Sequence, residues 1–168
     1  LTGLMGLSGG IIGTFVGGIG SDWFTQKTGY GRLVFLFFIL LACSPFMIAY
    51  RLAPGDSIWI PTGLFLGMFQ IGSFFGPFFA SIQGLIPPEV RSTVIAFSIL
   101  VMNVIGMGIG ITLTGVSIDV ITSYGIDQPY SVTLLGFTVF SFLAMPCFLF
   151  AGLRYKHDQE RLQISEAS

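Results

Sequence analysis

Residues 94–118, VIAFSILVMNVIGMGIGITLTGVSI, contain no Asp, Glu, Lys, Arg or His, and this run decides the class of protein. A helix needs roughly 20 apolar residues, each rising about 1.5 Å, to cross the hydrocarbon core of a bilayer. A surface helix of a soluble protein would instead carry charged residues along its outward face. Four more stretches are free of charge, at residues 1–20, 33–50, 58–83 and 131–153. The sequence therefore predicts an all-α membrane protein with five transmembrane helices.

Composition supports this class and excludes others. Hydrophobic residues make up 53% of the chain and charged residues 9%, whereas an average soluble domain is about 25% charged. The net charge of -1 provides no basic surplus for binding nucleic acid. Cys43 and Cys147 both lie in apolar stretches, where we interpret them as small buried hydrophobes. We predict a lipid bilayer as the partner, and no nucleic acid, metal site, cofactor or catalytic residue.

Basic residues in the short connections predict the orientation, because cytoplasmic loops are enriched in Lys and Arg. Of the 7 Lys and Arg residues, all but Arg51 fall in alternate connections or in the tail. We therefore predict a multi-pass protein with a membrane bundle at 1–153 and a cytoplasmic tail at 154–168. The tail is expected to form a short interfacial helix that fades into disorder. Because the chain opens inside an apolar stretch at Leu1, we expect further protein upstream.

Small residues form stripes on two of the predicted helices. On the first helix the stripe consists of Gly6, Gly10, Gly13 and Gly17. On the fourth it consists of Asn103, Gly106, Gly110 and Thr114. In lipid, such stripes allow close helix packing, so we expect the fourth span to be packed inside a bundle. Static packing and sliding against neighbouring helices remain alternatives for these glycines.

A polar stripe crosses the aromatic third span. It contains Gln70, Ser73 and Phe74, with Phe69 beside them. An amide that faced lipid would be costly. We therefore predict that these residues, together with Asn103 of the fourth span, line a substrate cavity. The alternative is that Gln70 hydrogen-bonds a neighbouring helix, and the sequence leaves both interpretations open.

Two motifs carry a resemblance to a known family. The first is Gly18-Ile-Gly-Ser-Asp22, followed by Lys27 and by Gly29-Tyr-Gly-Arg32. The second is Pro87-Pro88-Glu89-Val90-Arg91-Ser92-Thr93, extended by Asn103-Val-Ile-Gly106-Met-Gly-Ile-Gly110 and Gly115-Val-Ser-Ile-Asp119. On these residues the chain resembles the major facilitator superfamily of secondary transporters. Within that superfamily it is similar to the spinster-like lipid transporters and related organic-anion carriers.

The resemblance implies that the spans are helices eight to twelve of a twelve-helix fold and form most of its C-terminal six-helix bundle. The N-terminal bundle of the same transporter would be the partner, with a central cavity between the bundles and alternating access. The resemblance also implies a conformational switch. Its residues would be Gly18, Asp22, Lys27, Arg32 and Arg91.

Substrate class follows from the scarcity of polar residues. Polar solutes demand several fixed polar partners, whereas these spans offer few and are rich in Phe, so we expect a lysolipid-like or other amphiphilic substrate. An organic anion or sugar carrier is the alternative. Protons are a candidate coupling ion, but the spans hold no Asp or Glu at bilayer depth, so a titrating carboxylate is expected elsewhere. In the family that the chain resembles, a basic residue usually follows the Asp of the switch motif, whereas here Trp23 follows Asp22. This departure implies that the contact made by the switch motif is weaker than in relatives.

Two rival classes of membrane protein fit the sequence less well. Gly6-Leu7-Ser8-Gly9 resembles the serine loop of intramembrane rhomboid-type proteases, but such a serine needs a histidine as its base. The only histidine is His157 in the tail, so we do not predict an enzyme. A channel would require rings of polar residues at matched depth, and only scattered Gln70 and Asn103 are present. A purely structural membrane subunit also remains an alternative.

Overall fold

A computed structural model of the chain describes residues 2–53, 59–126 and 128–166. Within these ranges the long elements are helices, and five of them are long and apolar enough to cross a membrane. These candidate spans are Gly3–Thr28, Arg32–Leu52, Trp59–Leu85, Arg91–Ser123 and Pro129–Tyr155. The all-helical architecture and the five predicted membrane-spanning helices are therefore confirmed by length and composition.

Short irregular segments divide three of the spans. The elements, in chain order, are α1 (Thr2–Phe15), η1 (Val16–Gly20), α2 (Ser21–Thr28), α3 (Arg32–Leu52), α4 (Trp59–Leu85), α5 (Arg91–Val101), η2 (Met102–Ile109), α6 (Gly110–Ser123), α7 (Pro129–Ser141), η3 (Phe142–Ala144) and α8 (Met145–Glu166). The η1 and η2 segments are π-helical and coincide with glycine-rich sequence, and η3 is a 3-10 turn just before Pro146. Of the three irregular segments, η1 and η2 contain glycines and η3 contains none. Pro45 and Pro77 lie inside unbroken helices.

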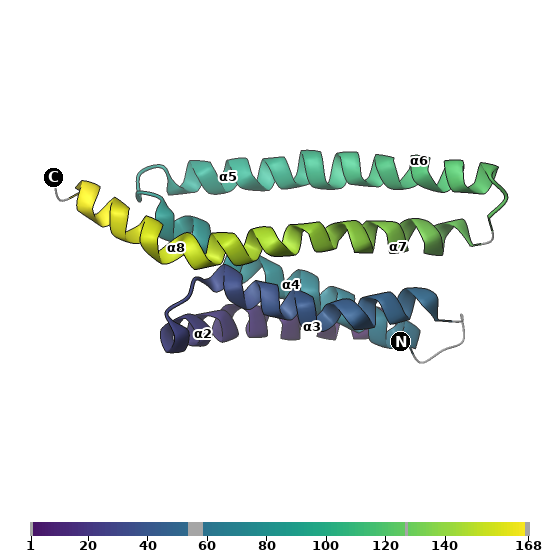
Figure 1. Cartoon of the computed structure of the whole chain (residues 1–168), viewed down its shortest axis with the longest axis horizontal. Helices are drawn as coiled ribbons and strands as arrows, with labels where there is room; N and C mark the ends of the chain where they lie inside the picture. Colours follow the sequence, from purple (N-terminus) through teal and green to yellow (C-terminus); the bar gives the residue numbers. More distant parts are fainter. Residues whose placement is uncertain (1, 54–58, 127, 167–168) are drawn as a thin grey trace.

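The helices form long rods arranged around α4 and α3 (Figure 1). α4 packs against α1 on one side and α3 on the other, and α3 in turn contacts α7 and α8. α6 packs on α7, whereas α5 touches α4 only weakly near their connection. The core of the described chain therefore lies between α1, α4, α3 and α8.

Connections alternate between the two ends of the bundle. The α2–α3 and α4–α5 connections lie at the same end as the C-terminal part of α8 (Figure 1). The end of α3 and the α6–α7 connection lie at the opposite end. Lys27, Arg32 and Arg91 therefore share one end, and Arg51 lies at the other, as the charge pattern requires. Which end faces the cytoplasm stays a prediction.

The first span is longer than expected. We predicted a helix ending at Gly20 and a loop that contains Asp22 and Lys27, but α2 continues the helix to Thr28. The helix ends at Gly29, which adopts φ 75° and donates its N–H to the Thr25 carbonyl at 2.9 Å. Glycine tolerates this left-handed conformation, which most side chains avoid. Asp22 therefore lies on a rigid helix rather than in a loop.

The end of the chain also differs from expectation. We expected residues after 153 to form a separate interfacial helix, but α8 runs without a break from Met145 to Glu166. The backbone of residues 154–166 thus continues the axis of the last span. A continuous helix satisfies every interior backbone hydrogen bond, which explains why polar residues alone do not end it.

Within the described chain the fourth span lies at the edge of the bundle, so its predicted place inside a larger bundle stays a prediction. None of the residues in α5, η2 and α6 is buried. A Cβ built on Gly106, Gly110 or Gly115 would meet nothing within 4 Å. These three glycines therefore face no helix of the described chain, whereas Ser117 lies on the side of α6 that meets α7.

The most extensive helix contact in the described chain joins α1 to α4. A Cβ on Gly13 would lie 2.9 Å from the Phe69 Cα, and one on Gly17 would lie 2.6 Å from the Ser73 Cα. Two members of the predicted stripe are thus confirmed as packing positions. Gly6 makes only an ordinary contact, and the space beside Gly10 is open. Gly9 belongs to the contacting row instead, since its Cβ would lie 2.5 Å from the Phe65 carbonyl oxygen.

Candidate functional site

Gln70 lines a cavity of about 130 Å³ enclosed by α3, α4 and the α7–α8 span. Its polar lining consists of Gln70, Ser44, Thr138 and Ser141. Its apolar lining consists of Leu40, Met47, Phe142 and Met145. We call this the Gln70 cavity. A volume of this size holds a few water molecules or one small polar group.

The hydrogen bonds leave one fully uncommitted group in the Gln70 cavity. Ser44, Thr138 and Ser141 each donate their hydroxyl proton to a carbonyl of their own helix, at 2.8–2.9 Å. Their oxygens remain available as acceptors. Among the described residues, none forms a hydrogen bond with the Gln70 side-chain amide. Gln70 can therefore both donate to and accept from a molecule in the cavity.

Ser73 and Phe74, predicted to share that cavity, serve helix packing instead. The Ser73 hydroxyl is fully buried, 3.0 Å from the Gly13 carbonyl of α1 and 2.8 Å from the Phe69 carbonyl of its own helix. Phe74 stacks on Phe78 with ring centroids 4.9 Å apart. Phe69 contributes its backbone to the α1 contact. The predicted stripe is thus divided between two environments, because the α1 side and the α3 side of α4 meet different helices.

Asn103 is remote from the Gln70 cavity. It lies on η2, its side chain is exposed, and its amide donates to the Ile99 carbonyl one turn earlier at 2.8 Å. The structure therefore does not bring the two intramembrane amides together.

A second hollow lies on the opposite face of α4, between that helix and α1. It has a volume of about 950 Å³, and we call it the α1–α4 groove. Its lining consists of Gly3, Gly6, Leu7, Gly10, Ile11, Thr14, Leu64, Met68, Ile71, Gly72 and Phe75. Its only hydroxyl, that of Thr14, donates to the Gly10 carbonyl at 2.9 Å. The groove is therefore an apolar surface with its polar atoms already paired.

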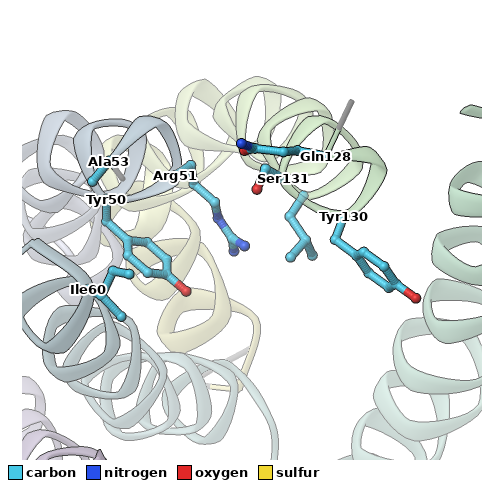
Figure 2. Close-up of a pocket in the computed structure, with 8 residues that line it drawn as sticks. Tyr50, Arg51, Ala53, Ile60, Gln128, Tyr130 and Ser131 are labelled. Carbon is cyan, nitrogen blue, oxygen red and sulfur yellow. The ribbon is translucent and has the colours of Figure 1, made fainter. Parts of the chain in front are cut away.

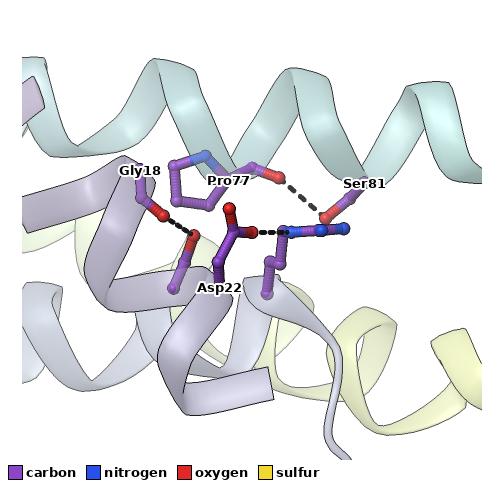
Figure 3. Close-up of polar contacts among 6 residues, drawn as sticks. Gly18, Asp22, Pro77 and Ser81 are labelled. Atoms are coloured by element: carbon purple, nitrogen blue, oxygen red, sulfur yellow. Dashed lines mark hydrogen bonds and ion pairs between the residues drawn. The ribbon is translucent and has the colours of Figure 1, made fainter. Parts of the chain in front are cut away.

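The predicted switch motif forms an ion pair. Arg32 Nε donates to Asp22 Oδ1 at 2.6 Å, joining α2 to the first residue of α3 (Figure 3). Gly18 precedes it on η1, and its Cα would lie 3.3 Å from a Cβ placed on Gly76 of α4. Gly18 thus allows the first span to approach α4 just above the ion pair. Asp22 and Arg32 were both predicted to belong to the switch motif, and the structure pairs them.

The other two basic residues of the motif make different contacts. Lys27 Nζ lies 4.9 Å from the centroid of the Trp23 ring, so this cation lies over the face of the indole. Arg91 begins α5 and donates to the Ile86 carbonyl at 3.4 Å. No ion pair joins Arg91 to Asp22 within the described residues.

Sequence reasoning missed the three hydroxyl residues that surround Gln70. Thr138 and Ser141 are three residues apart on the last span, and Ser44 lies in the middle of the second. Polar residues inside apolar spans were the available signal, but single hydroxyls are common in membrane helices because they can bond to their own backbone. Their convergence on Gln70 is a property of the packing.

Comparison with known proteins adds no further constraint. The chain matches no family model, no curated protein and no solved structure.

Proposed function

We propose that this chain is part of a secondary transporter of the major facilitator type, which moves a lysolipid-like or other amphiphilic substrate by alternating access. The observation that carries the proposal is the pair of contrasting surfaces on α4. One face lines the apolar α1–α4 groove, and the opposite face holds the unpaired amide of Gln70 beside the hydroxyls of Ser44, Thr138 and Ser141. An amphiphile requires both environments along its route.

The balance of polar groups favours an amphiphile over a sugar. A sugar displays several hydroxyls that each need a fixed partner, because an unpaired buried hydroxyl costs about 1–3 kcal/mol. The Gln70 cavity has one uncommitted amide and three hydroxyls whose protons are already used. It can satisfy one small head group. The groove of about 950 Å³, a separate site on the opposite face of α4, offers room for an alkyl chain at another stage of the route.

The helix contacts also suit a conformational change. The backbone contact of Gly13 and Gly17 with α4 has few protruding side chains, so the two helices can shift along each other without repacking large groups. The Asp22 and Arg32 side chains are 53% and 28% exposed. An exposed ion pair is worth only about 0–1 kcal/mol, so it can break and re-form at little cost.

The proposed partners follow from the same features. The uncovered face of α5, η2 and α6 is proposed to contact the N-terminal bundle of the transporter. If transport is coupled to protons, the titrating carboxylate is proposed to lie in that bundle, because the central part of each of the five spans contains no Asp or Glu. The same framework places the C-terminus in the cytoplasm.

Transport by the reconstituted full-length protein tests the proposal. We expect uptake of a radiolabelled lysophospholipid, and we expect Gln70→Ala to lower its rate about fivefold, the value of one hydrogen bond near 1 kcal/mol. Gln83→Ala is the matched control, because Gln83 is an exposed amide near the end of the same helix. Uptake of small anions or sugars without the lysophospholipid would refute the amphiphile proposal. A Gln70→Ala variant that transports and expresses like wild type would remove Gln70 from the site.

A further inference from the structure

A separate cavity of about 450 Å³ lies at the end of the bundle where α3 ends and α7 begins. We call it the Arg51 pocket (Figure 2). Its lining consists of Tyr50, Arg51, Ala53, Ile60, Gln128, Tyr130, Ser131 and Leu134. It shares no lining residue with the Gln70 cavity or the α1–α4 groove.

Arg51 is the charged group of this pocket. Its side chain points into the space between Tyr50 and Ser131 (Figure 2). The Nε atom is buried and has no hydrogen-bond partner among the described residues, and the guanidinium carbon lies 5.2 Å from the centroid of the Tyr50 ring. No described carboxylate forms an ion pair with it. Asp56 and Asp127 lie outside the described residues.

A buried, unpaired guanidinium N–H is costly, and an anion relieves that cost best. When a buried N–H of a charged group has no hydrogen-bond partner, the cost in free energy is larger than that of losing a hydrogen bond between neutral groups. An arginine that only anchored the helix at the membrane surface would extend its whole head group into water. In Arg51 the Nε atom is buried, so part of the head group is withdrawn from water.

The opposite wall of the pocket presents a second feature that favours an anion. α7 begins at Pro129, and no side chain caps its first turn. Tyr130 and Ser131, the next two residues, line the pocket, and their backbone N–H groups precede the first intrahelical bond, which Val132 donates to the Gln128 carbonyl at 3.2 Å. The positive end of the helix dipole therefore faces the same cavity as Arg51.

We propose that the Arg51 pocket binds a phosphate-type oxyanion, carried either by a phospholipid head group or by a soluble phosphate. The guanidinium supplies a planar pair of donors that matches two phosphate oxygens, and the α7 N-terminus and the Ser131 hydroxyl complete the shell. Ile60 and Leu134 provide apolar contacts for a glycerol or alkyl group. Tyr50 and Tyr130 lie at the ends of their spans, where aromatic residues meet lipid head groups. The binding does not depend on any transport activity.

Ligand titrations of the purified full-length protein in detergent test this site. The probes are phosphatidylglycerol, diacylglycerol, which lacks the phosphate, and inorganic phosphate, with binding followed by thermal unfolding and native mass spectrometry. We expect saturable binding of phosphatidylglycerol that is at least about tenfold weaker in Arg51→Gln, which loses charge-assisted hydrogen bonds. Arg51→Lys keeps the charge but loses the planar pair of donors, so it should bind more weakly than wild type and more tightly than Arg51→Gln. Arg154→Gln, at the other end of the bundle, should bind like wild type.

Each outcome has a defined meaning. Binding of phosphatidylglycerol without inorganic phosphate identifies a lipid head group, whereas equal binding of inorganic phosphate identifies a soluble ligand. Either result supports the oxyanion site if it depends on Arg51. Diacylglycerol that binds as tightly as phosphatidylglycerol, or an Arg51→Gln variant with wild-type affinity, overturns it. If Arg51→Gln elutes as aggregate, Ser131→Ala replaces it, with an expected loss of a few-fold, and an unchanged affinity in that variant likewise overturns the proposal.

Discussion

Replacing Gly17 with alanine should separate the two helices with the most extensive contact in the described chain. The added Cβ would lie 2.6 Å from the Cα and 2.8 Å from the carbonyl carbon of Ser73, and still closer to the Ser73 carbonyl oxygen. All three are backbone atoms of α4, so no side chain can turn away to make room. Pro77 lacks an N–H, so it makes no helical bond to the carbonyl of Ser73, and Gly17 provides the room beside this carbonyl.

The expected cost follows from the distances. Ordinary carbon contacts begin near 3.5 Å, so α1 must move by about 1 Å, and overpacking of this kind costs about 1–3 kcal/mol. The same movement lengthens the 3.0 Å bond from the Ser73 hydroxyl to the Gly13 carbonyl, whose loss costs about 0.5–1.5 kcal/mol. Alanine also stabilises the helix itself by about 0.5–1 kcal/mol relative to glycine, which offsets part of this loss. The net destabilisation should be about 1–3 kcal/mol.

Thermal unfolding in detergent measures this effect. We expect Gly17→Ala to lower the Tm by about 3–10 °C. Gly10→Ala is the matched control, since Gly10 lies on the same helix and its Cβ would meet nothing within 4 Å. A Gly17→Ala variant as stable as wild type or as Gly10→Ala would refute the conclusion that this backbone contact stabilises the bundle.

Two further predictions concern the ion pair and the cysteines. Asp22→Asn and Arg32→Gln should each slow transport while lowering the unfolding free energy by less than about 1 kcal/mol, because the pair is partly exposed. A double variant that exchanges the two charges, Asp22→Arg with Arg32→Asp, should recover part of the transport rate. If this double variant is no faster than either single variant, a switch made by this pair is excluded. A lipid-permeant maleimide should modify Cys147 much faster than Cys43 when each is kept as the sole cysteine, because Cys147 is exposed and Cys43 is buried. Mass spectrometry of the digested protein gives both rates, and faster modification of Cys43 would contradict the packing of α3.

The candidate sites show how far residue spacing can be trusted. Gln70, Ser73 and Phe74 share one side of α4 by helical spacing, yet Gln70 opens toward α3 while Ser73 is buried against α1. Residues on one side of a helix can still differ widely in direction, so two of them can contact two different neighbouring helices. The Asp22–Arg32 pair was predictable because the two residues lie ten positions apart across a short connection. The Arg51 pocket was not, since it joins the ends of three helices that are distant in sequence.

The sequence by itself determined the class and the crossing pattern of this protein. Charge is so costly in hydrocarbon that the uncharged stretches had to become spans, and the alternation of connections follows from counting them. Only the tertiary structure decided which faces meet: Gly17 contacts α4, whereas the similar glycines of α5–α6 contact nothing described. The physical reason is that lipid is as apolar as the helices, so hydrophobicity does not select helix partners in a membrane. Partner choice depends on backbone fit and single hydrogen bonds, and these exist only once the helices are placed in space.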